Sequence, residues 1–179
     1  MWERVCAHFG LQPEEDFLKA LEENYWDTVE AQTALFPETL RVLAGLAPEY
    51  DLALVTNTQG QKDSAKHRID RFPALEGIFR VMIVAGESGV PPKPDPIPFR
   101  LCLRRLGISP GEAVFVGDDW RIDIQGALNT GIQPIWLRHR LVQRTWPDAG
   151  TPVPTIDSLD RLLDMESLLF STHDGTIRP

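Results

Sequence analysis

The chain has few of the residues that mark secreted, disulfide-bonded or membrane proteins. It has only two cysteines in 179 residues, Cys6 and Cys102, and they lie too far apart in sequence to form a metal-binding pair. We expect a reduced, cytoplasmic protein, with Cys102 in a hydrophobic core. No apolar run is long enough for a membrane-spanning helix, and no secretory signal pattern is present. These absences exclude a disulfide-stabilised scaffold and a membrane protein.

Positive charge is also scarce. The chain has 18 lysines and arginines against 26 aspartates and glutamates, which gives a formal net charge of −8. This balance argues against a nucleic-acid backbone or an anionic membrane as partner. A protein this acidic needs a bound metal or a well-placed lysine if it handles phosphate esters. With 42% hydrophobic residues, the chain is long enough for one globular core and a small accessory part.

Hydrophobic periodicity predicts a helical start followed by an α/β core. Residues 1–35 and 39–47 are predicted to be helical. Short apolar runs then predict strands, which alternate with expected helices: strands at 52–55, 79–85, 113–116 and 132–137, and helices at about 62–72, 96–106, 119–131 and 159–163. Residues 139–154 are predicted to cross the surface irregularly. The alternation predicts a parallel sheet with helices on both faces.

Several helix ends are marked by residues that stabilise unpaired backbone groups. Asp95 before Pro96 predicts the start of a helix, and Gly107 predicts its end. Ser109 and Glu112 have the spacing of a capping box. These local signals place a helix at about 96–106 and a capped turn directly before the third predicted strand.

The most informative stretch is Val114–Asp123, in which an apolar strand leads into a glycine and three carboxylates, Asp118, Asp119 and Asp123. Open α/β sheets bind their ligands at the carboxyl ends of parallel strands. Clustered carboxylates there suit Mg²⁺, which prefers oxygen ligands and often shares them with a phosphate. The simpler alternative is an acidic turn in which Asp119 caps the next helix.

Two other polar sites follow predicted strands in the same way. Thr56 and Asn57 follow the strand at 52–55, and Lys93 lies in a proline-rich loop after the strand at 79–85. Together with the acidic cluster, they predict one phosphate site with a hydroxyl, an ammonium and bound Mg²⁺. Taken singly, Thr56 could simply end a strand and Lys93 could be a solvated loop residue. The histidines receive no role, and Trp120, Trp136 and Trp146 are predicted to be packing residues.

Three of these segments resemble motifs of one known family. The segments 54–57 (LVTN), 93–96 (KPDP) and 116–127 (VGDDWRIDIQGA) look like the second, third and fourth motifs of the haloacid dehalogenase-like (HAD) hydrolases. The resemblance covers roughly residues 36–137 and is to the phosphatase branch with a helical cap. It implies a Rossmann-like parallel sheet flanked by helices. Residues 1–35 would be part of the cap, residues 36–165 the core and residues 166–179 a tail.

The same resemblance implies roles for the site residues. Thr56 would bind the transferring phosphoryl group, with Asn57 beside it. Lys93 would orient the nucleophile and balance charge. Asp118 and Asp123 would bind Mg²⁺, with Asp119 as a further candidate ligand. The implied function is a Mg²⁺-dependent phosphohydrolase that acts on a small phosphorylated metabolite.

One part of the family pattern is missing. The family's nucleophile is the first aspartate of an Asp-x-Asp motif that ends the central strand, and no Asp-x-Asp occurs in this chain. Covalent catalysis cannot proceed without a nucleophile. The tail contains a partial match at 168–176 (LLFSTHDGT), with Thr172 at the nucleophile position and Asp174 at the acid–base position. A chance tripeptide in the tail is the favoured explanation of this match.

Three hypotheses for function follow. The chain is an enzyme whose nucleophile segment is encoded upstream of Met1, or a phosphate- and Mg²⁺-binding or regulatory module without turnover, or, less favoured, a 2-haloacid dehalogenase. An in-frame upstream strand ending in Asp-x-Asp would support the first, and a stop codon close upstream would favour the second. A phospho-receiver domain is set aside because its motifs run in a different order. Substrate identity and homodimer formation stay open.

The central strand position is expected to be filled. Leaving it empty would expose two rows of backbone donors and acceptors inside the sheet. The candidates are a tail strand at 167–172, a strand from another copy of the chain, or direct pairing of the strands at 52–55 and 113–116.

Overall fold

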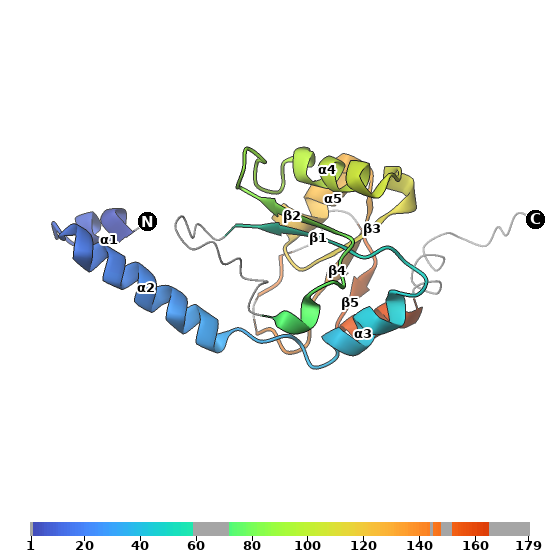
Figure 1. The fold of residues 1–179 in the computed structure, drawn as a ribbon, viewed down its shortest axis with the longest axis horizontal. Helices are drawn as coiled ribbons and strands as arrows, with labels where there is room; N and C mark the ends of the chain where they lie inside the picture. Colours follow the sequence, from blue (N-terminus) through green and yellow to red (C-terminus); the bar gives the residue numbers. More distant parts are fainter. Residues whose placement is uncertain (1, 59–71, 144, 148–151, 165–179) are drawn as a thin grey trace, which may run out of the picture. The chain divides into compact units, whose positions relative to one another are not determined.

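A computed structural model of the chain describes residues 2–58, 72–143, 145–147 and 152–164. They divide into two compact units, Met1–Phe36 and Pro37–Pro179. The first unit consists of α1 (Trp2–His8) and α2 (Glu15–Gln32), as the periodicity predicted (Figure 1). The Trp2 ring packs edge-on against Tyr25 with centroids 5.5 Å apart, and Cys6 is buried. The role of this unit as a cap stays a prediction.

The described residues of the second unit form five strands in two parallel sheets. β1 (Ala53–Asn57) pairs with β2 (Val81–Ala85) in one sheet. β3 (Val114–Gly117) pairs with β4 (Gln133–Leu137), which pairs with β5 (Thr155–Ile156), in the other. Parallel pairing throughout confirms the α/β prediction. Direct pairing of β1 with β3 was one of the three expectations for the central position, and it is wrong for the described residues.

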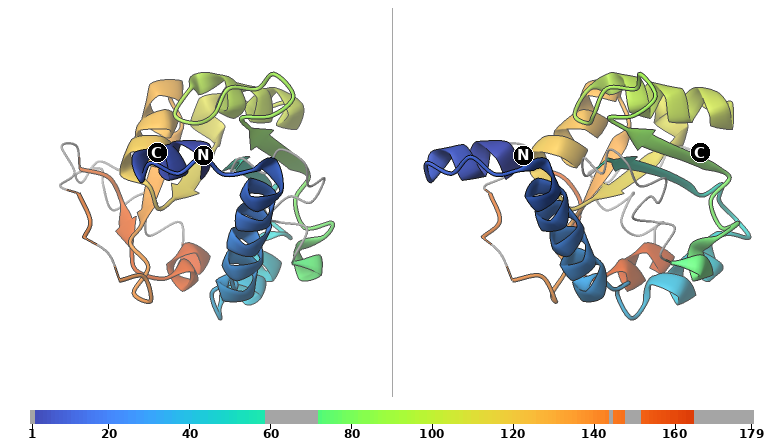
Figure 2. Two further views of the ribbon diagram at one scale, coloured as in Figure 1. Left: turned by 90° about the vertical axis from the view of Figure 1, so that its left-hand side faces the viewer. Right: turned by 60° about the vertical axis from the view of Figure 1, so that its left-hand side comes forward.

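Helices lie on both sides of these strands (Figures 1 and 2). α4 (Pro96–Leu106) and α5 (Gln125–Thr130) cover one side, and α3 (Thr39–Leu46) and the 3₁₀-helix η5 (Leu159–Asp164) lie on the other. Two shorter 3₁₀-helices are η2 (Pro73–Leu75) and η3 (Pro110–Glu112). The expected helix at 62–72 lies almost wholly outside the described residues. None of the described helices is long and apolar enough to cross a bilayer.

The main core lies between the strands and the α4–α5 layer. One cluster contains Val55, Ile83 and Cys102, and another contains Phe99 and Ala127. Phe115 of β3 packs against both clusters. Burial raises the pKa of the Cys102 thiol, as expected for a core cysteine rather than a reactive one.

The predicted packing role of the tryptophans is confirmed. Trp120 and Trp136 are buried against Ile124, and their ring centroids are 4.9 Å apart. Trp146 contacts Trp136 edge-on at 5.8 Å. These rings form a second hydrophobic cluster around β4, and they pack against other residues of the protein.

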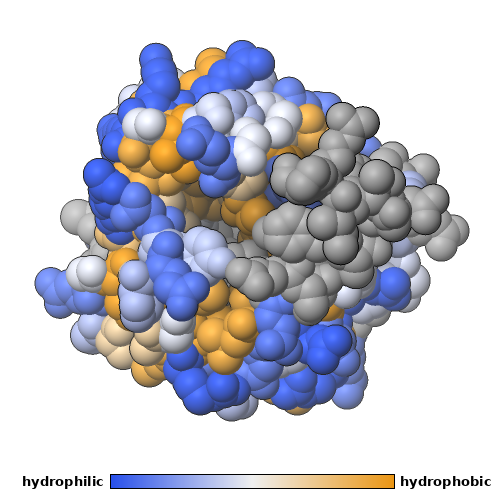
Figure 3. Space-filling model, turned by 90° about the vertical axis from the view of Figure 1, so that its right-hand side faces the viewer, coloured by the Kyte–Doolittle hydropathy of each residue, from blue (hydrophilic) through white to orange (hydrophobic). Residues whose placement is uncertain are grey.

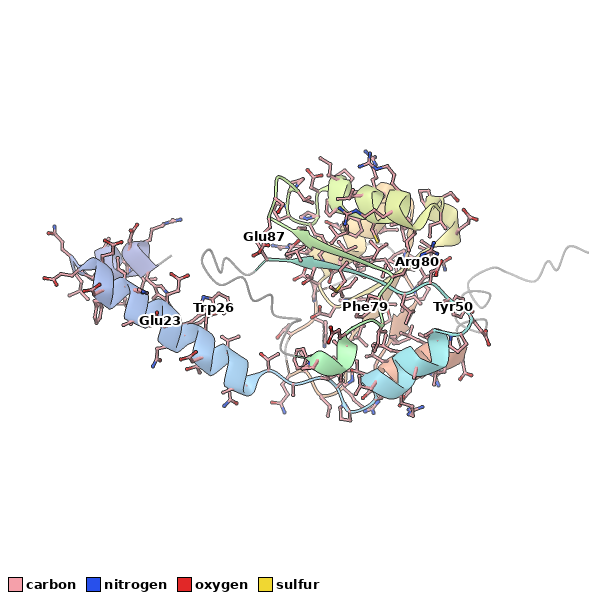
Figure 4. All side chains as sticks on the ribbon, viewed as in Figure 1. Glu23, Trp26, Tyr50, Phe79, Arg80 and Glu87 are labelled. Atoms are coloured by element: carbon pink, nitrogen blue, oxygen red, sulfur yellow. The ribbon has the colours of Figure 1, made fainter. Side chains whose placement is uncertain are left out.

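Local capping chemistry sets the helix ends as the sequence predicted. The Asp95 carboxylate accepts a hydrogen bond from the Ile97 backbone N–H at 2.8 Å, and Gly107 ends α4 with φ of 77°. Glu112 accepts bonds from the Ser109 backbone and hydroxyl at 2.8 and 2.6 Å. Figure 4 shows the direction of β2, because Arg80 lies just before its first residue and Glu87 just after its last.

A buried polar cluster joins three distant segments of this unit. The Glu38 carboxylate, at the start of α3, accepts hydrogen bonds from the Ser158 hydroxyl at 2.6 Å and from His139 Nε2 at 2.8 Å. All three residues are at most 6% exposed. The Leu141 N–H donates to His139 Nδ1 at 3.2 Å, so Nε2 carries the imidazole proton that binds Glu38. No role was predicted for His139 from the sequence, and the structure places it in this cluster.

We expect Glu38→Gln to lower the free energy of unfolding at pH 7 by about 3 kcal/mol. The Ser158 hydroxyl, opposed by burial and helped by His139, lowers the pKa of Glu38 from 4.5 to about 2. This stabilisation is present above pH 4.5 and is lost as the pH falls from 4.5 towards 2. Urea titrations across that range should therefore show a flatter pH dependence for the variant.

The matched control is Glu112→Gln. Hydrogen bonds from Ser109 also lower the pKa of Glu112, but that carboxylate is solvent-exposed, so water screens the effect. The control should leave the pH dependence almost unchanged. Equal pH profiles for wild type and Glu38→Gln would show that the buried cluster does not hold Glu38 ionised.

Candidate functional site

Thr56 and Asn57 are the last two residues of β1, whereas the sequence predicted that the strand ends at Val55. Pairing continues to this point because Asn57 lies opposite Ala85 of β2, and the Thr58 N–H donates to the Ala85 carbonyl at 2.7 Å. A threonine is well suited to a strand, so the local sequence favours this extension. The Thr56 hydroxyl lies 3.4 Å from the Asn57 carbonyl oxygen.

Asn57 fixes the proline-rich loop to the end of β1. Its side-chain Oδ1 accepts from the Lys93 backbone N–H at 2.8 Å, and its Nδ2 donates to the Lys93 carbonyl at 3.1 Å. One amide therefore satisfies both backbone groups of Lys93, a residue 36 positions away. The Lys93–Pro94 peptide bond is cis. This pair of bonds determines where the Lys93 side chain begins.

The Lys93 ammonium reaches towards the carboxyl ends of β1 and β3. Its Nζ donates to Asp123 Oδ1 at 2.7 Å and to the Val55 carbonyl at 2.8 Å. The Lys93 and Asp123 side chains are each 9% exposed, and Nζ lies 5.4 Å from the centre of the Phe115 ring. In such a poorly solvated position, the attraction between the two charges is much stronger than at the surface. Lys93 is therefore a buried, paired cation.

Asp123 is held close to the backbone of β3. Its Oδ2 accepts from the Asp119 N–H at 3.1 Å while Oδ1 binds Lys93. A Cβ atom at Gly117 would lie 2.3 Å from the Asp123 Cβ and 2.8 Å from Oδ2. Any side chain at position 117 would thus displace the carboxylate. This close approach explains the glycine that precedes the acidic cluster.

Asp119 caps the turn that follows β3. Its Oδ1 accepts from the backbone N–H groups of Arg121 and Ile122, both at 2.9 Å. The segment Trp120–Ile124 forms a π-helical turn before α5 begins at Gln125. The capping alternative for Asp119 is confirmed, and its role as a metal ligand stays a prediction.

The three acidic residues after β3 are candidate ligands for Mg²⁺. Among the described residues, no group of three or more His, Cys, Asp or Glu side chains gathers in a way that could hold a metal. Mg²⁺ usually needs only one or two carboxylates, with water and substrate phosphate completing its shell. Asp118 and Asp123, which follow β3, fit that requirement by number and by their hard oxygen donors. Within the protein, Oδ1 of Asp119 caps the following helix, and both oxygens of Asp123 accept hydrogen bonds, from Lys93 and from the Asp119 N–H. Each of these two carboxylates would therefore share an oxygen between the metal and a protein donor.

The structure brings together three of the predicted site residues, namely Asn57, Lys93 and Asp123. Asn57 ends β1, whereas Lys93 and Asp123 lie in the segments that follow β2 and β3, as expected for polar residues after parallel strands. Thr56 is adjacent to Asn57 in β1, and the Asp118 carbonyl accepts from the Trp136 indole N–H at 3.1 Å. The catalytic, substrate-binding and metal-binding roles of these residues stay predictions.

Two contacts of this site were not predicted from the sequence. The sequence did not predict that Asn57 anchors the Lys93 backbone or that Val55 supplies an acceptor for its ammonium. The first has a weak sequence signal, since an asparagine at a strand end is suited to binding a neighbouring loop. The second has no signal, because a backbone carbonyl is present at every residue.

Comparison with known proteins gives one family match. Residues 3–137 match the family described as haloacid dehalogenase-like hydrolase. Among curated proteins, the human N-acylneuraminate-9-phosphatase is 32% identical over 157 residues, which cover 86% of this chain and 60% of that protein. The chain thus spans about 60% of the length of the first curated relatives that it matches.

Solved structures agree with this match. A HAD phosphatase from Thermococcus onnurineus is 27% identical with a TM-score of 0.63, and the alignment covers 93% of this chain and 71% of that one. A 2-haloacid dehalogenase from Pseudomonas syringae pv. Tomato DC3000 is 28% identical with a TM-score of 0.65, covering 92% and 69%. Both chains are longer than the aligned region.

Proposed function

The chain belongs to the haloacid dehalogenase-like hydrolase family, in its phosphatase branch, and from this premise we propose that it forms the phosphate-binding core of a Mg²⁺-dependent phosphohydrolase. In this proposal the substrate is a small phosphorylated metabolite. The chain itself lacks turnover because it contains no Asp-x-Asp nucleophile motif. The observation that carries the proposal is the buried Lys93–Asp123 pair, held by Asn57 at the carboxyl ends of the strands.

Each side chain in the site has a distinct task in this proposal. The Thr56 hydroxyl donates to a phosphoryl oxygen, and the Lys93 ammonium balances the negative charge of the phosphate. Asp118 and Asp123 would hold Mg²⁺, which supplies further positive charge to the phosphoryl oxygens when it is bound. Asn57 positions Lys93 through its backbone. Residues 1–35 are assigned to a helical cap in this proposal.

A non-catalytic binding or regulatory module is the second candidate. The absence of Asp-x-Asp from the sequence favours it directly. Such a module would keep the same phosphate and Mg²⁺ pocket, so phosphate binding is common to both candidates. A 2-haloacid dehalogenase is less favoured because Thr56, Asn57 and the acidic cluster suit a phosphate ester.

Two buried free thiols, Cys6 and Cys102, support a reducing compartment, and we place the protein in the cytoplasm within this proposal. A negative net charge of −8 gives no support to nucleic acid as a partner. The proposed partner is therefore the small phosphorylated ligand.

We expect Thr56→Val to weaken binding of inorganic phosphate, measured by calorimetry with Mg²⁺ present, by on the order of 10–100-fold. The substitution removes a hydroxyl donor to a charged acceptor and keeps the β-branched shape that the strand prefers. Thr155→Val on β5 is the control, because the Thr155 hydroxyl donates to the nearby Val153 carbonyl, away from the proposed site. Unaltered phosphate affinity in Thr56→Val, or no binding by wild type, would contradict the proposed site.

A further inference from the structure

Trp136 of β4 is buried but carries one polar group that needs a partner. On the face shown in Figure 3, hydrophilic side chains protrude and apolar ones line a hollow, which is the usual separation of the two residue types. Trp136 belongs to the interior, since it is only 2% exposed. At that depth its indole N–H needs an acceptor within the protein. The acceptor is the Asp118 carbonyl, at 3.1 Å.

This hydrogen bond joins β4 to the first residue after β3. Gly117 is the last residue of β3, and it lies opposite Trp136 in the parallel register. The backbone pairing of the two strands ends at this pair, so Asp118 lies just beyond it. The Trp136 side chain therefore extends the connection between the strands by one residue, with an indole N–H as the donor in place of a backbone N–H.

The peptide unit between Asp118 and Asp119 is held at both of its polar groups. Its carbonyl accepts from Trp136, and its N–H, which belongs to Asp119, donates to Asp123 Oδ2 at 3.1 Å. Because a peptide unit is planar, bonds to both groups fix its orientation. Gly117 in β3 holds the other side of Asp118. The direction in which the Asp118 side chain leaves the backbone is therefore determined.

The same peptide unit connects Trp136 to the buried ion pair. Asp123 binds the Asp119 N–H through Oδ2 and the Lys93 ammonium through Oδ1, the latter at 2.7 Å. A chain of contacts thus leads from Trp136 through this peptide to Asp123 and Lys93. Since Asp118 contributes the carbonyl of the peptide and Asp123 binds its N–H, the relative position of these two acidic residues depends on it.

The Trp136 ring is itself fixed by packing. Its centroid lies 4.9 Å from that of Trp120, and both rings pack against Ile124, which is fully buried. The Arg138 guanidinium lies over the Trp136 ring, 5.1 Å from its centre. A ring enclosed in this way has little freedom to change rotamer, so its indole N–H is a donor of fixed direction.

We propose that Trp136 is a positioning residue of the acidic site. Its indole orients the peptide unit between Asp118 and Asp119, and through that unit it sets the positions of Asp118 and Asp123. The significance of this role rests on the proposed function, which assigns these two residues to Mg²⁺. The positioning itself is a property of the metal-free protein. Trp136 thus has a task besides its packing role.

Amide hydrogen exchange in metal-free buffer tests the positioning. Trp136→Phe removes the indole N–H and keeps an aromatic ring, so we expect the Asp119 N–H to exchange about tenfold faster than in wild type. Trp120→Phe is the matched control, because that ring belongs to the same cluster and, in the described part of the chain, its indole gives no hydrogen bond to the acidic residues. The control should keep the wild-type exchange rate. Equal exchange in wild type and Trp136→Phe would overturn the proposal.

A measurement on wild-type protein decides the matter if Trp136→Phe does not fold. Nuclear magnetic resonance should detect a scalar coupling across the hydrogen bond, from the Trp136 indole ¹⁵N to the Asp118 carbonyl ¹³C. Such a coupling requires the bond itself and not merely a buried ring. Its absence would overturn the proposal without any variant.

Calorimetric titration with Mg²⁺ separates this inference from the proposed function. If both hold, Trp136→Phe should bind Mg²⁺ about 3–10-fold more weakly than wild type, and Trp120→Phe should match wild type. Wild-type protein that binds no Mg²⁺, with Asp119 exchange still dependent on Trp136, would contradict the proposed metal site and support the positioning role. Wild-type Mg²⁺ affinity in Trp136→Phe would show that the indole does not position the acidic residues and would overturn the inference.

Discussion

The purified chain is expected to hydrolyse para-nitrophenyl phosphate with Mg²⁺ on the order of 10⁴–10⁶-fold more slowly than a family phosphatase that has its aspartate nucleophile. No Asp-x-Asp occurs in the 179 residues, and formation of an acyl phosphate needs a carboxylate to attack phosphorus. Binding residues such as Thr56 and Lys93 can hold a phosphate, but they cannot replace that covalent step. A steady-state assay, with such a family phosphatase as positive control, measures the difference between the two hydrolysis rates.

The Asp118→Ala variant shows whether any residual activity is background hydrolysis or turnover at the proposed site. If the chain is inactive, the variant and wild type should show the same background rate. Turnover at an ordinary enzymatic rate that disappears in Asp118→Ala would contradict the prediction and show that another residue supplies the nucleophile. Asp174, which lies outside the described residues, would then be the first to replace with asparagine.

Lys93→Met is expected to lower the free energy of unfolding by about 3–5 kcal/mol in metal-free buffer. The substitution keeps most of the side-chain length but leaves the Asp123 carboxylate, 9% exposed, without its cation. It also removes the ammonium that donates to the Val55 carbonyl. Guanidinium-chloride titration followed by tryptophan fluorescence measures the loss, because Trp120 and Trp136 lie in the core of this unit.

The exposed Arg80–Asp51 ion pair provides the control. Its side chains are 57% and 51% exposed, so Arg80→Met should cost no more than about 1 kcal/mol. The double variant Lys93→Met/Asp123→Asn should recover part of the loss, because it removes the uncompensated charge. A cost for Lys93→Met as small as that for Arg80→Met would contradict the assignment of a buried, structural ion pair.

Most of the elements and several of their ends could be predicted from the sequence. The α4 boundaries follow from Asp95 and Gly107, whose capping and positive φ depend on immediate neighbours. The order of polar residues after successive strands also followed from the sequence, since parallel strands bring such residues to one edge. β5 was missed because two residues give no readable periodicity.

The arrangement of the site was decided by tertiary contacts. Asn57 binds the backbone of a residue 36 positions away, and Glu38 meets His139 across 101 positions. No local pattern encodes such pairs, because they form only when packing brings the segments together. The same holds for the placement of β1 and β3 in separate sheets among the described residues, which the sequence of neither strand indicates.

The sequence by itself determined the parallel α/β class, the order of the site residues and the absence of an Asp-x-Asp nucleophile. Those properties depend on residue type, short-range periodicity and strand direction. Only the tertiary structure decided that Lys93 is a buried cation shared by Asp123 and the Val55 carbonyl, and that Asp119 serves as a helix cap. The physical reason is that charge pairing and desolvation depend on distances in space, which the spacing of residues along the chain does not fix.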